Sequence, residues 1–311
     1  MESHVRTRPS CYIKRKGAAI RTARPFFLDN PFAGAIISAE ASVRVSKILC
    51  AGVAVAWALA GLGGSVLSAQ RTPLRVCADP DYLPFSNRAG EGFENKIAEA
   101  VAKALGQTVQ YAWANTRARG GFPEFLALTL DAKKCDVVMG LPYGNREELT
   151  TQPYYVSSYV FVFKKSKNYD IKSMDSPILQ KIKIGLEGDT PVEDGVKIRG
   201  MLTRATIFDV GSTSGESPAT MLDALEKGQI DVLITWEPAI GRFLNRYRDL
   251  DLVAVPNART LGAPEQYVFP ISMAVRQGDE ALKKRLDQVI ADHQSELTAI
   301  LTQYGVKLYT P

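Results

Sequence analysis

The chain has 311 residues, of which 46% are hydrophobic and 23% charged, so it is long enough for one large or two mid-sized globular domains. Its formal charge of +5 is concentrated at the start, since residues 1–69 hold nine of the basic residues and only three acidic ones. Residues 70–311 hold 29 basic and 30 acidic residues. They lack the excess of basic charge that phosphate binding requires, which excludes nucleic acid as a partner.

Residues 1–69 have the features of an N-terminal extension followed by a signal peptide. Arg44 and Lys47 precede an apolar run at 48–62, and small residues follow it. We expect cleavage near residues 68–70, a periplasmic location, and no stable membrane insertion of the mature chain. An uncleaved membrane anchor is the alternative, because the apolar run approaches the ~20 residues that span a bilayer.

From residue 73 onward, strand patterns alternate with helix patterns. One helical face is marked by apolar residues at every fourth position, which are Phe93, Ile97, Val101 and Leu105. The predicted elements of this first series are strands at 74–78, 108–113 and 136–140 and helices at 93–105 and 123–132. Strand and helix in regular alternation predict a parallel sheet with right-handed crossovers.

A long extended segment, PYYVSSYVFVFKK, separates this series from a second one. The second series consists of strands at 183–186 and 231–236, one helix that begins at Thr190 and Pro191, and another that begins at Ser217 and Pro218. A second extended segment, QYVFPISMAVRQG, then leads into a helical tail. The polar stretch 164–181 is interpreted as a solvated face, with a partner surface as the alternative.

Two series joined by two extended segments predict an α/β protein with two parallel-sheet lobes and a two-stranded hinge. We expect the first lobe in residues 70–164 plus 267–311 and the second lobe in residues 165–266. Ligands bind such sheets beyond the carboxyl ends of the strands, which here places the site in the cleft between the lobes.

Two cysteines, Cys77 and Cys135, lie on or beside predicted strands of the mature chain. In an oxidising compartment such a pair predicts a disulfide, and two buried free thiols are the alternative. The mature chain has a single histidine, His293, and no strand is followed by a glycine-rich nucleotide-binding motif. No metal site and no cofactor are therefore predicted.

Several strings together carry a family likeness: LRVCADPDYLPFSN, GEGFENKIAEAVAKALG, CDVVMG, KIGLEGDTP and LEKGQIDVLITWEPAIG. Over residues 73–305 the chain resembles type II periplasmic solute-binding proteins, which implies their two-lobed fold. The opening string and TTQPYYVSSYVFV also resemble a narrower group, the quinoprotein-dehydrogenase-associated substrate-binding-like proteins of methylotrophs. That resemblance implies a role beside a dehydrogenase dependent on pyrroloquinoline quinone (PQQ), typically methanol dehydrogenase, in its assembly or activation.

The anchors that hold a free amino acid in such proteins are altered in this sequence. An arginine after the third strand usually binds the ligand carboxylate with two hydrogen bonds, but Arg146 lies too close to the following extended segment. The aspartate expected for the ligand ammonium group is replaced by Trp236, and the adjacent Glu237 points to the other side if the strand continues. Free α-amino acids are therefore not expected as ligands.

The predicted cleft combines aromatic walls with hydroxyl and amide groups, which suits a small neutral or aromatic ligand or a peptide segment of a partner. Purely structural roles are the alternatives for three of these residues. Asp79 can cap a turn, and Glu94 can interact favourably with the dipole of its own helix. Thr190 can cap a helix, although the free N–H groups at that helix N-terminus can also bind an anion or a carbonyl group of a ligand. The candidate ligand-binding residues are Asp79, Tyr82, Phe85, Ser86, Asn87, Glu94, Tyr143, Arg146, Thr190, Trp236 and Glu237.

Three functions follow from these observations. The leading one is an accessory binding protein of a quinoprotein dehydrogenase. The first alternative is the solute receptor of an ABC transporter for a small ligand other than an amino acid. The second is a dehydratase that uses Glu94, Glu237 or Asp79 as acid or base, but no nucleophile–base pair is visible, so we do not expect an enzyme.

Overall fold

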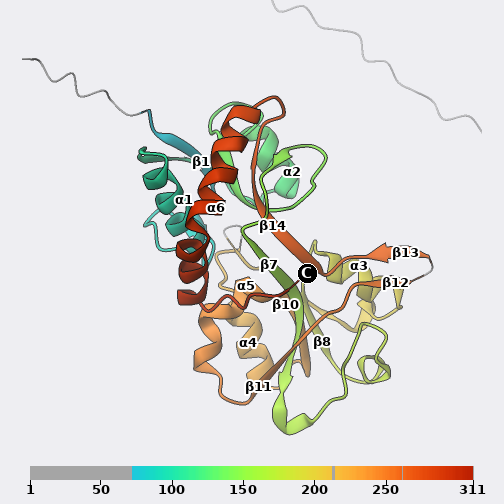
Figure 1. The fold of residues 1–311 in the computed structure, drawn as a ribbon. Coiled ribbons are helices and arrows are strands. Elements are labelled where there is room, and N and C mark those ends of the chain that lie inside the picture. Colours follow the sequence, from blue (N-terminus) through green and yellow to red (C-terminus); the bar gives the residue numbers. More distant parts are fainter. Residues whose placement is uncertain (1–71, 212–213, 261, 311) are drawn as a thin grey trace, which may run out of the picture. The chain divides into compact units, whose positions relative to one another are not determined.

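The first sheet forms as the strand pattern predicts. The computed structural model describes residues 72–211, 214–260 and 262–310 (Figure 1). In it, β1 (Leu74–Ala78) pairs in parallel with β4 (Val109–Trp113) on one side and with β5 (Val137–Pro142) on the other. This parallel arrangement confirms the α/β interpretation of the first series.

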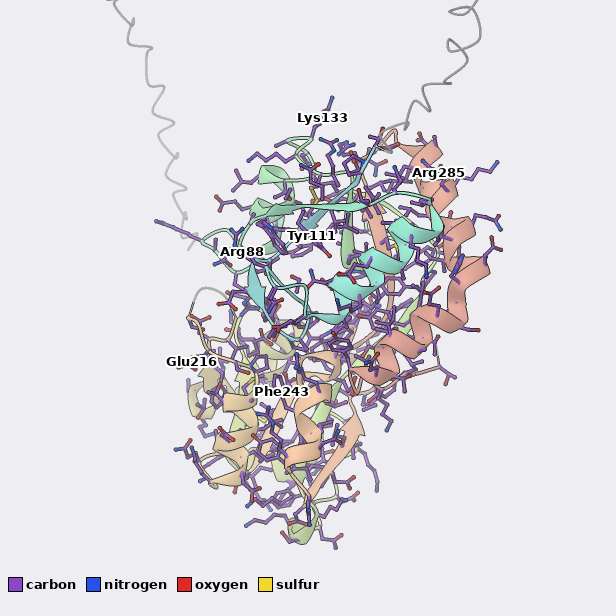
Figure 2. All side chains as sticks on the ribbon, turned by 90° about the vertical axis from the view of Figure 1, so that its left-hand side faces the viewer. Arg88, Tyr111, Lys133, Glu216, Phe243 and Arg285 are labelled. Atoms are coloured by element: carbon purple, nitrogen blue, oxygen red, sulfur yellow. A yellow bond between two sulfur atoms is a disulfide. The ribbon has the colours of Figure 1, made fainter. Side chains whose placement is uncertain are left out.

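Helix α1 (Phe93–Ala104) follows the four-residue spacing of its apolar side chains. Phe93, Ile97 and Val101 are completely buried and pack in one cluster with residues of the long C-terminal helix α6 (Glu280–Gln303). The two helices lie side by side along the first lobe, as the two views show (Figures 1 and 2). The apolar stripe of each helix is therefore covered by the other helix and by the sheet.

Both extended segments form long strands that run between the two lobes. β7 (Tyr155–Lys164) and β14 (Val268–Val275) pair antiparallel with each other. β14 also pairs with β5 of the first lobe, and β7 pairs with β10 (Val232–Trp236) of the second. The resulting strand order is β4-β1-β5-β14-β7-β10-β8-β9, which confirms the predicted two-stranded hinge.

The second lobe repeats the strand–helix alternation. β10 pairs in parallel with β8 (Ile184–Glu187), and β8 pairs in parallel with β9 (Thr206–Phe208). Helices α3 (Pro191–Ile198) and α4 (Ala219–Glu226) connect these strands. The shorter elements of the fold are α2 (Gly121–Leu128), α5 (Glu237–Ile240), β2 (Asp81–Tyr82), β3 (Ser86–Asn87), β6 (Leu149–Thr150), β11 (Leu250–Ala254), β12 (Ala258–Thr260) and β13 (Ala263–Glu265).

The buried apolar side chains form separate cores in the two lobes. Residues such as Ile97 and Met273 belong to the core of the first lobe, and residues such as Phe161 and Leu186 belong to a core of the second. We propose that the lobes have the boundaries expected from the sequence, 70–164 plus 267–311 and 165–266, which this division of the cores supports.

The polar stretch 164–181 is not a simple solvated face. Its apolar residues Ile171, Met174 and Leu179 are buried, and they pack in the same core as Phe161 of β7. The charged residues between them stay outside; Lys172, for example, pairs with the exposed Asp170. The stretch therefore covers one face of the second-lobe sheet. The interpretation as a solvated face misses these buried apolar residues.

Cys77 and Cys135 form the predicted disulfide, with their Cα atoms 5.4 Å apart. The bond is possible because Cys77 lies on β1 and Cys135 lies two residues before β5, and these two strands are parallel neighbours. The predicted signal peptide, with its cleavage site near residues 68–70, lies outside the described residues. Within the described ranges, no helix is both long and apolar enough to cross a membrane.

Candidate functional site

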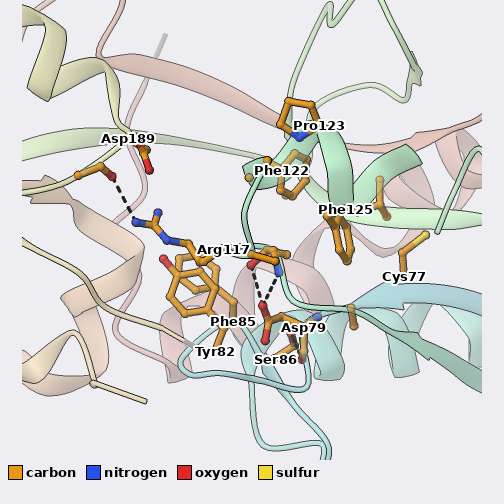
Figure 3. A pocket seen from close by; sticks show the side chains of 18 of the residues that line it. Cys77, Asp79, Tyr82, Phe85, Ser86, Arg117, Phe122, Pro123, Phe125 and Asp189 are labelled. Atoms are coloured by element: carbon orange, nitrogen blue, oxygen red, sulfur yellow. Dashed lines mark hydrogen bonds between the residues drawn. The ribbon is translucent and has the colours of Figure 1, made fainter. Parts of the chain in front are cut away.

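A cavity of about 930 Å³ lies between the two lobes. Its first-lobe wall comes from the loop after β1, the loop after β4, helix α2 and the middle of β5. Its second-lobe wall comes from the segment after β8 and from β9 with the residue that follows it. Figure 3 shows side chains from these elements converging on one space. The cavity therefore occupies the place where the strand topology predicts a ligand, beyond the carboxyl ends of the parallel strands.

Asp79 and Ser86 lie in the cavity wall, but they mainly hold the wall together (Figure 3). The buried Asp79 carboxylate accepts hydrogen bonds from the backbone N–H and the hydroxyl of Thr116, both at 2.7 Å. Its backbone exchanges two hydrogen bonds with the Ser86 hydroxyl. These contacts fix the loop after β4 against the end of β1. The carboxylate also accepts the backbone N–H of Asp81 at 2.9 Å, so the turn-capping role considered for Asp79 is present in the structure.

Tyr82 and Phe85 form the aromatic side of the cavity, with ring centroids 4.9 Å apart. The Tyr82 hydroxyl donates a hydrogen bond of 3.1 Å to Oε1 of Glu187, which lies at the end of β8 in the second lobe. Burial, together with the negative charge of Glu187, raises the pKa of the Tyr82 hydroxyl well above its ordinary value, so this group stays a donor. Tyr82 thus contacts both lobes.

Arg117 also crosses the cleft, from the loop after β4 to the second lobe. Its guanidinium forms an ion pair with Glu187 at 2.9 Å and donates a 3.2 Å hydrogen bond to the carbonyl oxygen of Gly188. In Figure 3 the Arg117 side chain extends toward the segment that carries Asp189. Burial raises the pKa of Glu187, whereas the charge of Arg117 and the hydrogen bond from Tyr82 oppose that rise.

Glu94, in the first turn of α1, lines the same cavity. Within the described part of the chain, its carboxyl group makes no hydrogen bond. The position of Gly140 leaves room for it, because a Cβ atom there would lie 2.5 Å from Oε1 of Glu94. Burial raises the pKa of Glu94 to about 8, and the nearby charge of Asp79 adds to the rise. At neutral pH the cavity therefore contains an uncharged carboxylic acid that can donate or accept a hydrogen bond.

A smaller cavity of about 320 Å³ adjoins the first one near the hinge strands. Its walls include four aromatic side chains, and the ring centroid of Trp236 lies 5.1 Å from that of Tyr159 and 6.0 Å from that of Phe269. Thr190 also lines this cavity, but as the residue before α3 it donates its hydroxyl to the Glu187 carbonyl oxygen rather than capping the helix. Tyr82 and Arg117 line both cavities.

Four predicted site residues lie outside both cavities. The side chain of Asn87 is tied to Glu91 by two hydrogen bonds. Tyr143 and Arg146 are exposed in the turn between β5 and β6, which follows Pro142 at the end of β5. Glu237 is buried at the start of α5, where both of its carboxylate oxygens accept the backbone N–H of Lys307. These four residues line neither cavity, and a contact between them and a ligand stays a prediction.

Arg117 and Glu187 are the residues that the sequence prediction missed. Arg117 lies in the loop after β4, and Glu187 is the last residue of β8. The carboxyl ends of parallel strands are where the side chains of a site gather. That position was the available signal, although the ARGG sequence after Arg117 looks like an ordinary turn. For the seven predicted residues that do line a cavity, ligand contact stays a prediction.

No metal centre is formed in the described ranges, where no three His, Cys, Asp or Glu side chains are placed to hold an ion. The acidic residues Asp189, Glu193 and Asp209 line the second-lobe wall of the larger cavity, and Arg119 lines the first-lobe wall. The chemistry available in the cleft is therefore hydrogen bonding, ion pairing and aromatic contact.

Comparisons with known proteins agree with this architecture. The family model of the bacterial extracellular solute-binding proteins, family 3, matches residues 74–307. Protein MoxJ of Methylorubrum extorquens is 30% identical over 248 residues, which cover 75% of this chain and 80% of that protein.

Two solved structures are similar over 76% of this chain and the whole of theirs. MxaJ from Methlophaga aminisulfidivorans has a TM-score of 0.69 at 26% identity, and the periplasmic binding protein XoxJ from Methylobacterium extorquens has a TM-score of 0.59 at 30% identity. Because the family model matches most of the chain and the fold is shared with these proteins, the chain belongs to the bacterial extracellular solute-binding proteins of family 3 and is a MoxJ-like, type II periplasmic binding protein.

Proposed function

We propose that the protein is a periplasmic accessory protein of a PQQ-dependent alcohol dehydrogenase, typically methanol dehydrogenase, and takes part in its assembly or activation. The likeness of the sequence to the quinoprotein-dehydrogenase-associated group supports this partner. The similarity to MoxJ supports the same narrow group within the family. The proposal assigns a binding role and no catalysis.

The observation that carries the proposal is the apolar mouth of the large cleft. Phe122 of α2 is 37% exposed and Ile207 of β9 is 50% exposed, and the two line the cavity from opposite lobes. Exposed apolar side chains around a concave site favour contact with a partner surface or chain segment. The cavity of about 930 Å³ is near the upper end of the range for small-molecule sites, ~300–1,000 Å³, so it has room for several side chains.

A capture experiment tests the partner. The tagged mature chain, residues 70–311, is isolated from the periplasm of its host grown on methanol, and the proteins that elute with it are identified by mass spectrometry. Stoichiometric recovery of a quinoprotein dehydrogenase subunit is the expected result, and capture of the same subunit by the tag alone would be non-specific. If the protein elutes alone or with a bound metabolite, the proposed partner is wrong.

A solute receptor of an ABC transporter is the second candidate, and the smaller cavity favours it. About 320 Å³ between Tyr159, Trp236 and Phe269 is the size of a small-ligand site rather than of a protein surface. Native mass spectrometry of the protein purified from the periplasm distinguishes the two functions. A metabolite retained in stoichiometric amount would favour the receptor, whereas an empty protein would favour the accessory role.

A further inference from the structure

The contacts between Tyr82, Arg117 and Glu187 join the two lobes inside the cleft. Tyr82 and Arg117 belong to the first lobe, and Glu187 belongs to the second. The Glu187 side chain is 4% exposed and that of Arg117 is 18% exposed, so the 2.9 Å ion pair between them is largely shielded from water. A third contact, from Arg117 to the carbonyl oxygen of Gly188, also crosses the cleft.

The energy of a shielded ion pair depends strongly on whether its two charged side chains stay in contact. Charge-assisted hydrogen bonds at about 2.9 Å are stronger than neutral ones, and removing one partner leaves a buried charge uncompensated. Burial lowers the pKa of the Arg117 guanidinium, but the negative groups around it, of which Glu187 acts most strongly, together outweigh burial and raise the pKa, so the guanidinium remains charged. Separating the lobes would expose both charges and break all three contacts, so the ion pair favours the closed arrangement.

The same ion pair determines which ligand charges the cleft accepts. The guanidinium is the group that would attract a ligand carboxylate, and a carboxylate of the protein already occupies it. The second-lobe wall adds the acidic side chains Asp189, Glu193 and Asp209. An anionic ligand would have to displace Glu187 and would meet further negative charge, whereas neutral and cationic groups meet neither obstacle.

We propose that Glu187 is an internal carboxylate that occupies Arg117, holds the lobes together without a ligand, and excludes anionic groups from the cleft. The cleft then selects neutral or cationic segments or ligands. This inference rests on the cleft being the binding site of the proposed function, but it does not depend on which partner binds there.

Acetate is the probe, because it reproduces the carboxylate that Glu187→Ala removes. We expect no saturable acetate binding to the wild-type mature chain in isothermal titration. We expect Glu187→Ala to bind acetate at least ~10-fold more tightly, a difference of ~1.4 kcal/mol, and acetamide to bind neither protein. The double variant Glu187→Ala with Arg117→Gln should lose the acetate site, and Asp170→Asn, which changes an exposed carboxylate that lines neither cavity, should behave as wild type.

The inference is overturned if folded Glu187→Ala gains no acetate site, or if the wild type binds acetate equally well. If Glu187→Ala does not fold, Glu187→Gln keeps the shape of the side chain and leaves the Arg117 charge without its counter-charge. It should then show both acetate binding and a larger radius of gyration in X-ray scattering, and the absence of both would overturn the inference. Failure to capture a dehydrogenase leaves these results unaffected, so the two proposals fail separately.

Discussion

The backbone N–H of Lys307 lies 3.1 and 3.0 Å from the two carboxylate oxygens of Glu237. Lys307 follows α6, which packs in the first-lobe core, and Glu237 begins α5 directly after β10 of the second lobe. Gly241 and Gly305 approach closely beside this contact, since a Cβ atom on either would collide with backbone of the other. The C-terminal segment is therefore a third crossing between the lobes, in addition to β7 and β14.

We expect Glu237→Ala to destabilise the protein, because it removes the buried carboxylate that accepts the backbone N–H of Lys307. The free energy of unfolding should fall by ~1–3 kcal/mol in urea titration. Glu147→Ala is the matched control, since Glu147 is exposed in the turn between β5 and β6. Equal stability of the two variants would show that the contact with Lys307 contributes nothing.

Stability should fall as the pH rises from about 5 to about 8. Burial raises the pKa of Glu94 and of Glu237 from 4.5 to about 8, so between these values the folded protein keeps protons that the unfolded chain has released. Each retained proton makes the free energy of unfolding decrease by up to ~1.4 kcal/mol per pH unit. In urea titrations across this range, the free energy of unfolding of Glu94→Gln should depend less steeply on pH than that of the wild type. An unchanged dependence on pH would contradict the raised pKa of Glu94.

Loss of the disulfide should destabilise the first lobe. Cys77 and Cys135 are separated by 58 residues in sequence, and on the chain-entropy model closing such a loop stabilises the folded state by ~4 kcal/mol. The double variant Cys77→Ser with Cys135→Ser should lower the free energy of unfolding by about this amount. A reducing agent should have the same effect on the wild type and none on the variant.

Trp236→Ala should lower stability as well as change the cleft. Trp236 packs against the cores of both lobes, and its ring contacts those of Tyr159 and Phe269. Truncating a large aromatic residue at such a position costs ~3 kcal/mol or more when the space cannot close. The melting temperature of Trp236→Ala is compared with that of Tyr143→Ala, a control that truncates an exposed aromatic residue outside both cavities. A melting temperature equal to the wild type would mean that Trp236 is only a cavity lining.

The strands and helices could be predicted from the sequence because their patterns are local. Phe93, Ile97 and Val101 mark their helix by spacing alone, and the extended segments of β7 and β14 are unmistakable in composition. Pairing of Cys77 with Cys135 could be proposed because each cysteine sits at a predicted strand, and parallel neighbours bring them together.

The centre of the site could not be predicted, because it depends on contacts between the lobes. Arg117 and Glu187 are 70 positions apart, and nothing local to either residue indicates that they meet. Arg146, a candidate whose spacing already departs from the family pattern, lies in the exposed turn after β5. The position of Glu237 beside Trp236 makes it a candidate for the cleft, but the chain turns into α5 there and the Glu237 carboxylate accepts the backbone N–H of Lys307.

The central claim, that the mouth of the cleft binds a quinoprotein dehydrogenase, is tested by a matched pair of variants. Ile207 and Leu128 are both 50% exposed, but only Ile207 lines the cavity. Binding of the purified dehydrogenase to immobilised wild type, Ile207→Asp and Leu128→Asp is measured by interferometry, after thermal unfolding has shown that all three fold. We predict affinity at least ~10-fold weaker for Ile207→Asp and unchanged for Leu128→Asp. Equal affinity of the two variants, or no binding by the wild type, would contradict the claim.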